Sequence, residues 1–130
     1  MDKQIYKVLL IEDNYADASL VQEILREDDA AKYELQYTNR LEKGLECLGR
    51  EPFDVLLLDL GLKESEGLET LKKIKSHHPQ IPTIVLTAFD DAGTGSCAIK
   101  EGAGDFLVKG LTTGEKLKGS IRNLVKSKNT

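Results

Sequence analysis

Five polar side chains that are able to do chemistry stand where apolar runs of the sequence end. They are Glu12, Asp13, Asp59, Thr87 and Lys109. The runs before them are rich in Val, Ile and Leu, a composition typical of strands that are buried on both faces of a sheet. Functional residues of an open parallel sheet gather at the carboxyl ends of its strands. We therefore expect three carboxylates, one hydroxyl and one ammonium group to meet at one edge.

Three carboxylates at one place repel each other, so such a site needs a positive charge. Mg2+ suits it, because this cation binds few protein carboxylates, keeps several waters and accepts phosphate oxygens. A carboxylate is also a nucleophile that can form an aspartyl phosphate. Phosphoryl transfer needs mainly positioning and charge stabilisation, which Mg2+, the Lys109 ammonium and the Thr87 hydroxyl would supply. A single acid of this kind would be interpreted as a solvated loop residue, but convergence with Lys109 favours a metal and phosphate site.

The elements that position these residues alternate along the chain. Predicted strands cover Ile5–Ile11, Phe53–Leu58, Thr83–Leu86 and Asp105–Val108, with Tyr33–Thr38 as a candidate edge strand. Stretches with helical spacing follow each of them, beginning with an apolar stripe of Leu20, Val21, Ile24 and Leu25. Strand–helix alternation repeated five times predicts an α/β fold with a parallel sheet and helices on both faces. Right-handed crossovers leave few topologies for it.

Local signals predict where two of the helices begin and end. Thr112 followed by Glu115 resembles a capping box at the start of the last helix. Gly102 is well placed to end the helix before it. That fourth helix is poor helical material near its start, where Gly93 and Gly95 each cost about 1 kcal/mol relative to Ala. We expect its start to fray or to begin late.

Size and composition limit the classes of protein and of partner. The 130 residues suit a single domain over 1–130, with 125–130 as a frayed tail or the start of a linker. A net charge of −4 and a pI near 5.2 argue against nucleic acid as a direct partner. No apolar run approaches the ~20 residues that span a bilayer, and no secretory signal is visible. Two cysteines favour a reducing compartment, so the expected location is the cytoplasm.

The chain resembles the receiver domain of two-component response regulators, which is the chemotaxis-Y-like family. Four segments carry the resemblance in the family's order and spacing, over nearly the whole chain: Val8–Asn14, Asp54–Leu60, Ile84–Ala88 and Asp105–Lys109. The resemblance implies a doubly wound, flavodoxin-like fold of five parallel strands in the order 2-1-3-4-5. It also implies signal relay, in which a histidine kinase or histidine phosphotransfer protein donates a phosphoryl group.

The resemblance implies a role for each matching residue. By this resemblance Asp59 is the phosphoacceptor and Lys109 is the phosphate partner. The expected switch residues are Thr87 and Phe106. The expected ligands of Mg2+ are Glu12, Asp13, Asp59 and the backbone carbonyl of Gly61. Such a domain assists its own phosphorylation and dephosphorylation and is not an enzyme for an external substrate. The surface of the fourth helix, fifth strand and fifth helix is the expected partner or homodimer face.

The sequence departs from the family where Gly110 follows Lys109. The family commonly has a cis-proline there, and because a non-proline cis bond costs about 3 kcal/mol we expect a trans bond and a more flexible loop. A haloacid-dehalogenase-type phosphatase would need a second Asp where Gly61 stands, and a nucleotide-binding module would need a Gly-rich loop after the first strand. The remaining alternative is a pseudo-receiver that binds partners without phosphorylation, against which the intact set of acids, Thr87 and Lys109 argues.

Overall fold

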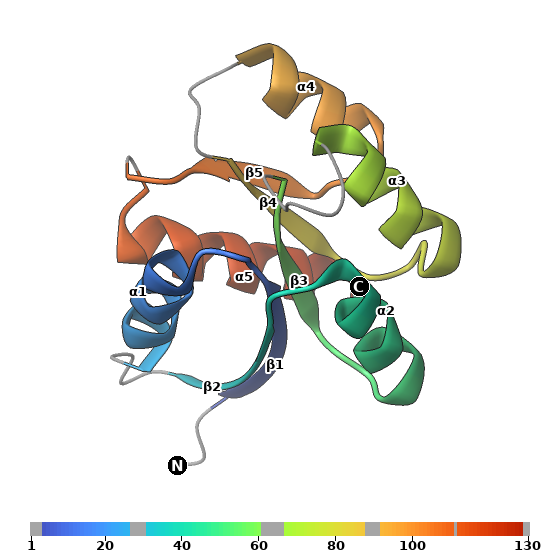
Figure 1. Ribbon diagram of the computed structural model, residues 1–130. Coiled ribbons are helices and arrows are strands. Elements are labelled where there is room, and N and C mark those ends of the chain that lie inside the picture. Colours follow the sequence, from blue (N-terminus) through green and yellow to red (C-terminus); the bar gives the residue numbers. More distant parts are fainter. Residues whose placement is uncertain (1–3, 27–30, 61–66, 88–91, 111, 129–130) are drawn as a thin grey trace.

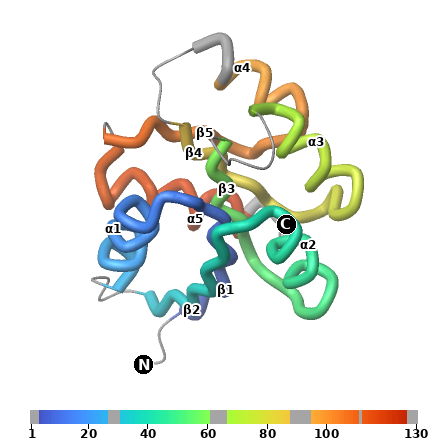
Figure 2. Tube along the Cα trace, in the orientation of Figure 1, coloured from blue at the N-terminus to red at the C-terminus, as the bar shows by residue number. Residues whose placement is uncertain are grey.

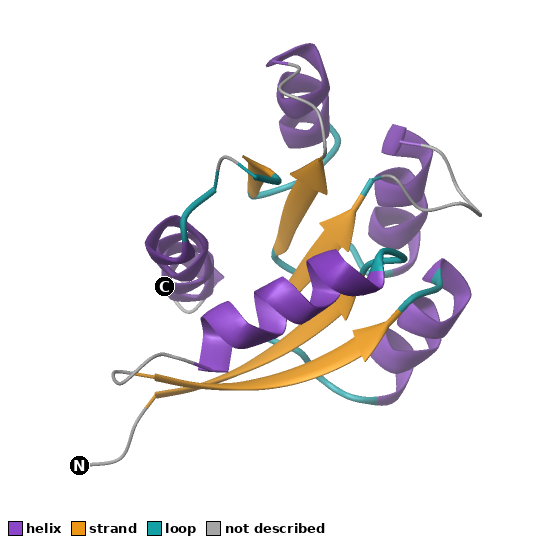
Figure 3. Cartoon of the chain, turned by 60° about the vertical axis from the view of Figure 1, so that its left-hand side comes forward, coloured by secondary structure: helices purple, strands orange, loops and turns teal. Residues whose placement is uncertain are grey.

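The computed structural model describes residues 4–26, 31–60, 67–87, 92–110 and 112–128. Strands and helices alternate along these residues (Figure 1): β1 Gln4–Ile11, α1 Tyr15–Arg26, β2 Ala31–Thr38, α2 Leu41–Arg50, β3 Val55–Asp59, α3 Gly67–His77, β4 Thr83–Thr87, α4 Ala92–Lys100, β5 Asp105–Val108 and α5 Gly114–Lys128. The strands form one parallel sheet in the order β2-β1-β3-β4-β5. The predicted fold class and strand order are therefore confirmed, and Figure 3 shows the strand arrows running the same way.

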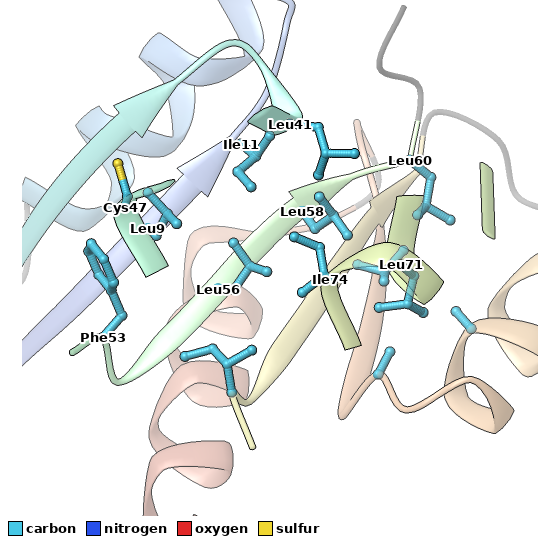
Figure 4. Packing of buried hydrophobic residues seen from close by; sticks show 14 residues of the cluster. Leu9, Ile11, Leu41, Cys47, Phe53, Leu56, Leu58, Leu60, Leu71 and Ile74 are labelled. Atoms are coloured by element: carbon cyan, nitrogen blue, oxygen red, sulfur yellow. The ribbon is translucent and has the colours of Figure 1, made fainter. Parts of the chain in front are cut away.

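Helices cover both faces of this sheet. α1 and α5 lie next to each other on one face, whereas α2, α3 and α4 cover the other (Figure 2). Consecutive residues of β3 point to opposite faces, so Leu56 and Leu58 pack under α2 and α3 while Val55 and Leu57 pack under α1 and α5. Figure 4 shows the first of these two layers, in which Leu71 and Ile74 of α3 lie against Leu58. Both faces of the central strands are thus buried, as their unbroken apolar composition predicts.

The strand at one margin of the sheet matches the candidate edge strand. Among the described strands, β2 pairs with β1 alone, and most of its residues keep partial exposure, which explains its mixture of apolar and polar side chains. The first helix differs from its predicted apolar stripe. Leu20 is 56% exposed, whereas Leu25 is buried against the sheet. The stripe predicted for this helix was therefore too wide on one side.

Backbone geometry confirms the predicted end of α4. Gly102 has φ of +109°, its N–H donates to the Ile99 carbonyl, and the Ala103 N–H donates to the Ala98 carbonyl. These are the two hydrogen bonds of a Schellman motif, and the positive φ explains why glycine stands there. The helix itself already begins at Ala92, before both of its early glycines.

The predicted capping box of α5 was wrong by one residue. Thr113 caps the helix, because its Oγ1 accepts the Lys116 N–H over 3.1 Å. The Thr112 hydroxyl instead donates to the Val108 carbonyl over 2.8 Å, which satisfies the end of β5. At its other end α5 continues through Lys128, and Val125 is buried, so the segment expected to fray is helical that far.

Candidate functional site

The acidic residues predicted at the strand ends lie together at one edge of the sheet. Ile11 of β1 pairs with Leu58 of β3, so the residues that follow, Glu12 and Asp59, are neighbours on adjacent strands. Glu12, Asp13 and Asp59 each offer a carboxylate oxygen, and these oxygens lie within 4.8 Å of one another. Glu12 is fully buried and Asp59 is 3% exposed. The burial makes this cluster different from solvated loop acids.

Lys109 extends from the end of β5 into this cluster. Its Nζ lies 2.6 Å from Glu12 Oε2 and 3.3 Å from Asp59 Oδ1. It also lies 3.0 Å from Asp17 Oδ2, in the first turn of α1. The backbone N–H of Lys109 donates to the Thr87 carbonyl over 2.8 Å, which ties the loop after β5 to the end of β4. The predicted convergence of carboxylates and ammonium is therefore present in the structure.

The charges at this edge are not balanced. Burial, and then the hydrogen bond with Asp59, raise the pKa of Glu12 from 4.5 to about 7, although the Lys109 ammonium and the Asn14 N–H act in the opposite direction. Burial alone would lower the pKa of Lys109, but its contacts with Glu12 and Asp17 outweigh this and raise it. Lys109 is thus a fixed cation, and one cation leaves an excess of negative charge.

The residues present fit a hard divalent cation. The buried Glu12 Oε2 lies 2.6 Å from the Lys109 ammonium, which it shares with the Asp59 carboxylate. An oxygen buried in this way, next to two further carboxylates, is a suitable ligand for Mg2+. Gly61, whose carbonyl was the fourth predicted ligand, lies outside the described residues.

Two neighbours of the acidic cluster were missed by sequence reasoning. Tyr37 of β2 donates its hydroxyl to the Glu12 carbonyl over 2.7 Å, and burial together with the charge of Glu12 and Asp13 raises its pKa. Asp17 contacts Lys109 across 92 positions of sequence. An acid in the first turn of a helix is ordinary in itself, because it complements the helix dipole. Neither residue therefore gave a signal that distinguished it from a structural one.

The two predicted switch residues lie on neighbouring strands. Thr87 ends β4 and is 6% exposed. Phe106 of β5 is half-buried against the core layer that contains Ala98 of α4. Its ring lies directly against Gly95 of α4, where an added Cβ would collide with the ring atoms. The structure thus places the aromatic ring in a space that exists because residue 95 has no side chain.

The loop after Lys109 has a conformation that glycine permits. Gly110 has φ of +83°, and among the described residues there is no cis peptide bond.

None of the helices in the described part of the chain combines the length and apolar character that a bilayer crossing requires.

Comparison with known sequences identifies relatives over most of the chain. A sequence profile of the response regulator receiver domain matches residues 8–122. The transcriptional regulatory protein ZraR of Klebsiella oxytoca is 34% identical over 104 residues, which cover 80% of this chain and 23% of that protein. The DNA-binding transcriptional regulator NtrC of Escherichia coli is 42% identical over 65 residues, or 50% of this chain and 14% of that protein. The chain therefore spans less than a quarter of the length of these relatives.

Solved structures show the same architecture. The response regulator receiver domain of Clostridium thermocellum has a TM-score of 0.83 and 26% identity, covering 95% of this chain and 97% of that one. A CheY-like receiver domain of Methanospirillum hungatei has a TM-score of 0.83 and 21% identity, covering 97% of this chain and 98% of that one. The sequence profile and the strand order agree over nearly the whole chain, and this protein belongs to the family of response regulator receiver domains.

Proposed function

We propose that this chain accepts a phosphoryl group on Asp59 and relays a two-component signal. The observation that carries the proposal is the position of the Asp59 carboxylate, which is almost fully buried between an acidic pair and the Lys109 ammonium. A carboxylate placed there for stability alone would be costly, since desolvation disfavours its charge. The same placement is suitable for a nucleophile whose product carries more negative charge than the carboxylate itself.

In the proposed reaction one oxygen of Asp59 attacks the phosphorus of a phosphohistidine donor. The new O–P bond forms as the N–P bond of the donor breaks, and that electron pair returns to the imidazole. Glu12, Asp13 and Asp59, with the Gly61 carbonyl, would hold Mg2+, which supplies positive charge for the phosphoryl oxygens. The Lys109 ammonium, 3.3 Å from Asp59, would contact a phosphoryl oxygen from the other side. Later attack by water on phosphorus returns the carboxylate and inorganic phosphate.

The signal would leave the site through Thr87 and Phe106. The phosphoryl group of an aspartyl phosphate carries about two negative charges, against one on the free carboxylate, and attracts the Thr87 hydroxyl, which lies at the end of the strand next to β3. Movement of Thr87 would make room for the Phe106 ring, whose present place is against Gly95. The surface of α4, β5 and α5 would change as a result, and it is the proposed face for a partner or a homodimer.

Residues 1–130 would form one receiver domain that acts in the cytoplasm. Its phosphodonor would be a histidine kinase or a histidine phosphotransfer protein, and the domain would not itself contact DNA. It would catalyse only the changes in its own phosphorylation. ZraR and NtrC are named as transcriptional regulators, and the aligned segments cover 23% and 14% of those two proteins.

Incubation with phosphoramidate and Mg2+ tests the proposal. Intact-mass measurement should show one added phosphoryl group, which alkali removes, and Asp59→Asn should abolish it. A matched control is Asp54→Asn, which lies before the same strand at the opposite edge and accepts the Lys7 N–H over 2.8 Å, a bond that asparagine retains. Absence of an adduct on the parent chain would favour the pseudo-receiver, and an equal yield on Asp59→Asn would move the phosphoacceptor to another residue.

A further inference from the structure

Lys109 is held by a carboxylate that lies outside the acidic cluster. Its Nζ donates a hydrogen bond to Asp17 Oδ2 over 3.0 Å, in addition to the ion pairs with Glu12 and Asp59. An ammonium group has three N–H donors, so it is able to serve all three carboxylates at once. Asp17 is the only one of these partners that comes from a helix, since it lies in the first turn of α1.

Asp17 is itself fixed relative to the acidic cluster. Its backbone N–H donates to Asn14 Oδ1 over 3.1 Å, which caps the start of α1. The Asn14 N–H donates in turn to Glu12 Oε1 over 3.1 Å. Glu12, Asn14, Asp17 and Lys109 therefore form a closed ring of polar contacts. The Asp17 carboxylate cannot shift far without disturbing this ring.

The surroundings of Lys109 strengthen the contact with Asp17. A pocket of about 80 Å3 lies between α1 and the loop after β5, with Asp17 and Lys109 in its wall. The rest of its lining is mostly apolar: Leu20, Val21, Ile24, Leu86, Leu107 and Leu117. The Lys109 side chain is only 19% exposed. Charged hydrogen bonds gain strength where apolar groups exclude water, an effect that the 38% exposure of the Asp17 side chain limits.

The backbone after Lys109 provides less restraint than the family usually has. Gly110 adopts a positive φ and carries no ring that would fix the loop. The described backbone contact of Lys109 is its N–H bond to the Thr87 carbonyl. The position of the ammonium group therefore depends strongly on its carboxylate partners. Of these partners, Glu12 and Asp59 belong to the proposed metal and phosphoryl site, whereas the proposed function assigns no role to Asp17.

We propose that Asp17 is a positioning residue for Lys109, an inference that rests on the proposed function. Its carboxylate holds one donor of Nζ, while the other two donors exchange the Glu12 and Asp59 carboxylates for phosphoryl oxygens. Asp17 thus restrains the side chain of Lys109, whereas a rigid residue after Lys109 would restrain its backbone. Without Asp17 the ammonium would spend less time beside Asp59, and phosphorylation would slow down.

The Asp17→Asn variant tests the proposal. The phosphorylation rate with phosphoramidate should fall roughly three- to fivefold, the size expected for an ion pair with one partly exposed partner. Glu42→Gln is the matched control, because it removes an acid from the first turn of α2 instead. It should leave the rate unchanged. Asp17→Glu, which keeps the charge, should recover part of the loss.

A double-mutant cycle separates positioning from a general role of Asp17 in α1. In a Lys109→Met background, Asp17→Asn should have no further effect on the residual rate, because the residue through which Asp17 acts is missing. An equal loss in both backgrounds would overturn the proposal and assign Asp17 to the helix. A rate of Asp17→Asn equal to or above that of the parent would also overturn it.

A second measurement needs no phosphodonor. In a chain labelled with 15N-lysine, the Lys109 ammonium should give a narrow signal, assigned by its loss in Lys109→Met. Asp17→Asn should broaden that signal, because a less restrained ammonium exchanges protons with water faster, and Glu42→Gln should not. An unchanged signal would sink the positioning role while leaving the proposed function intact. A narrow, Asp17-dependent signal in a chain that gains no phosphoryl group would instead refute the proposed function.

Discussion

Replacing Glu12 by glutamine should stabilise the metal-free protein at alkaline pH. The carboxylate is fully buried, and its pKa is raised from 4.5 to about 7, mainly by that burial. The folded state therefore binds this proton more tightly than the unfolded state. Between these two pKa values the folded state binds more protons than the unfolded state, so the free energy of unfolding falls as pH rises. The protonated Glu12 contributes its full stabilisation at pH values below the lower pKa, and this contribution is lost at pH values above the higher pKa.

The size of the effect follows from the same two values. A difference between 4.5 and about 7 corresponds to about 3 kcal/mol, at about 1.4 kcal/mol for each pKa unit. The glutamine amide has a similar shape and no charge at any pH. The Glu12→Gln variant should therefore match the parent near pH 4 and exceed its unfolding free energy by up to about 3 kcal/mol near pH 8.

Urea unfolding in EDTA at a series of pH values measures this difference directly. Glu34→Gln, which changes an exposed acid on β2, serves as the control and should follow the parent throughout. The reasoning fails if the difference between Glu12→Gln and the parent is independent of pH, or if the parent becomes the more stable of the two as pH rises. Mg2+ should reverse the order at high pH, because a bound cation stabilises the ionised carboxylate of the parent.

Two further predictions concern the metal and the aromatic ring. Asp13→Ala should remove most of the Mg2+ affinity, measured by titration calorimetry, because so few protein ligands are available; affinity equal to that of the parent would place the metal elsewhere. Gly95→Ala should lower the free energy of unfolding by about 1–3 kcal/mol, since the new methyl group collides with the Phe106 ring. In a Phe106→Ala background the same change should be neutral or stabilising by about 1 kcal/mol, the helix preference of alanine, and a loss equal to that in the parent would show that the ring is not the obstacle.

The fold was predictable because each strand and helix carries its own periodic signal. Val8–Ile11 before Glu12 and Val55–Leu58 before Asp59 are apolar without interruption, and the structure buries both runs on two faces. Since parallel strands end at one edge, the convergence of these acids with Lys109 follows from topology, and no contact had to be known. The site could be anticipated to the extent that its residues directly follow strands.

Contacts made between elements were not predictable in this way. Asp17 has no periodic relation to Lys109, and its position in the first helical turn has a sufficient local explanation. The capping residue of α5 was assigned one position too early, because Thr112 and Thr113 are both suitable caps in sequence. The structure decides between them, because the Thr112 hydroxyl donates to the Val108 carbonyl and leaves Thr113 to cap the helix. Exposure of Leu20 likewise depends on how α1 lies against α5.

The strand order has a consequence for the time course of synthesis. β1 and β3 lie side by side, and both are complete once the ribosome has made the first half of the described chain. Glu12, which follows β1, and Asp59, which ends β3, can therefore meet before β5 and Lys109 have been translated. A nascent chain at that stage carries these carboxylates without the Lys109 ammonium. We expect the early sheet to depend on protonation or on Mg2+ until the last strand docks, so that the segment bearing Lys109 reduces the excess of negative charge as it completes the sheet.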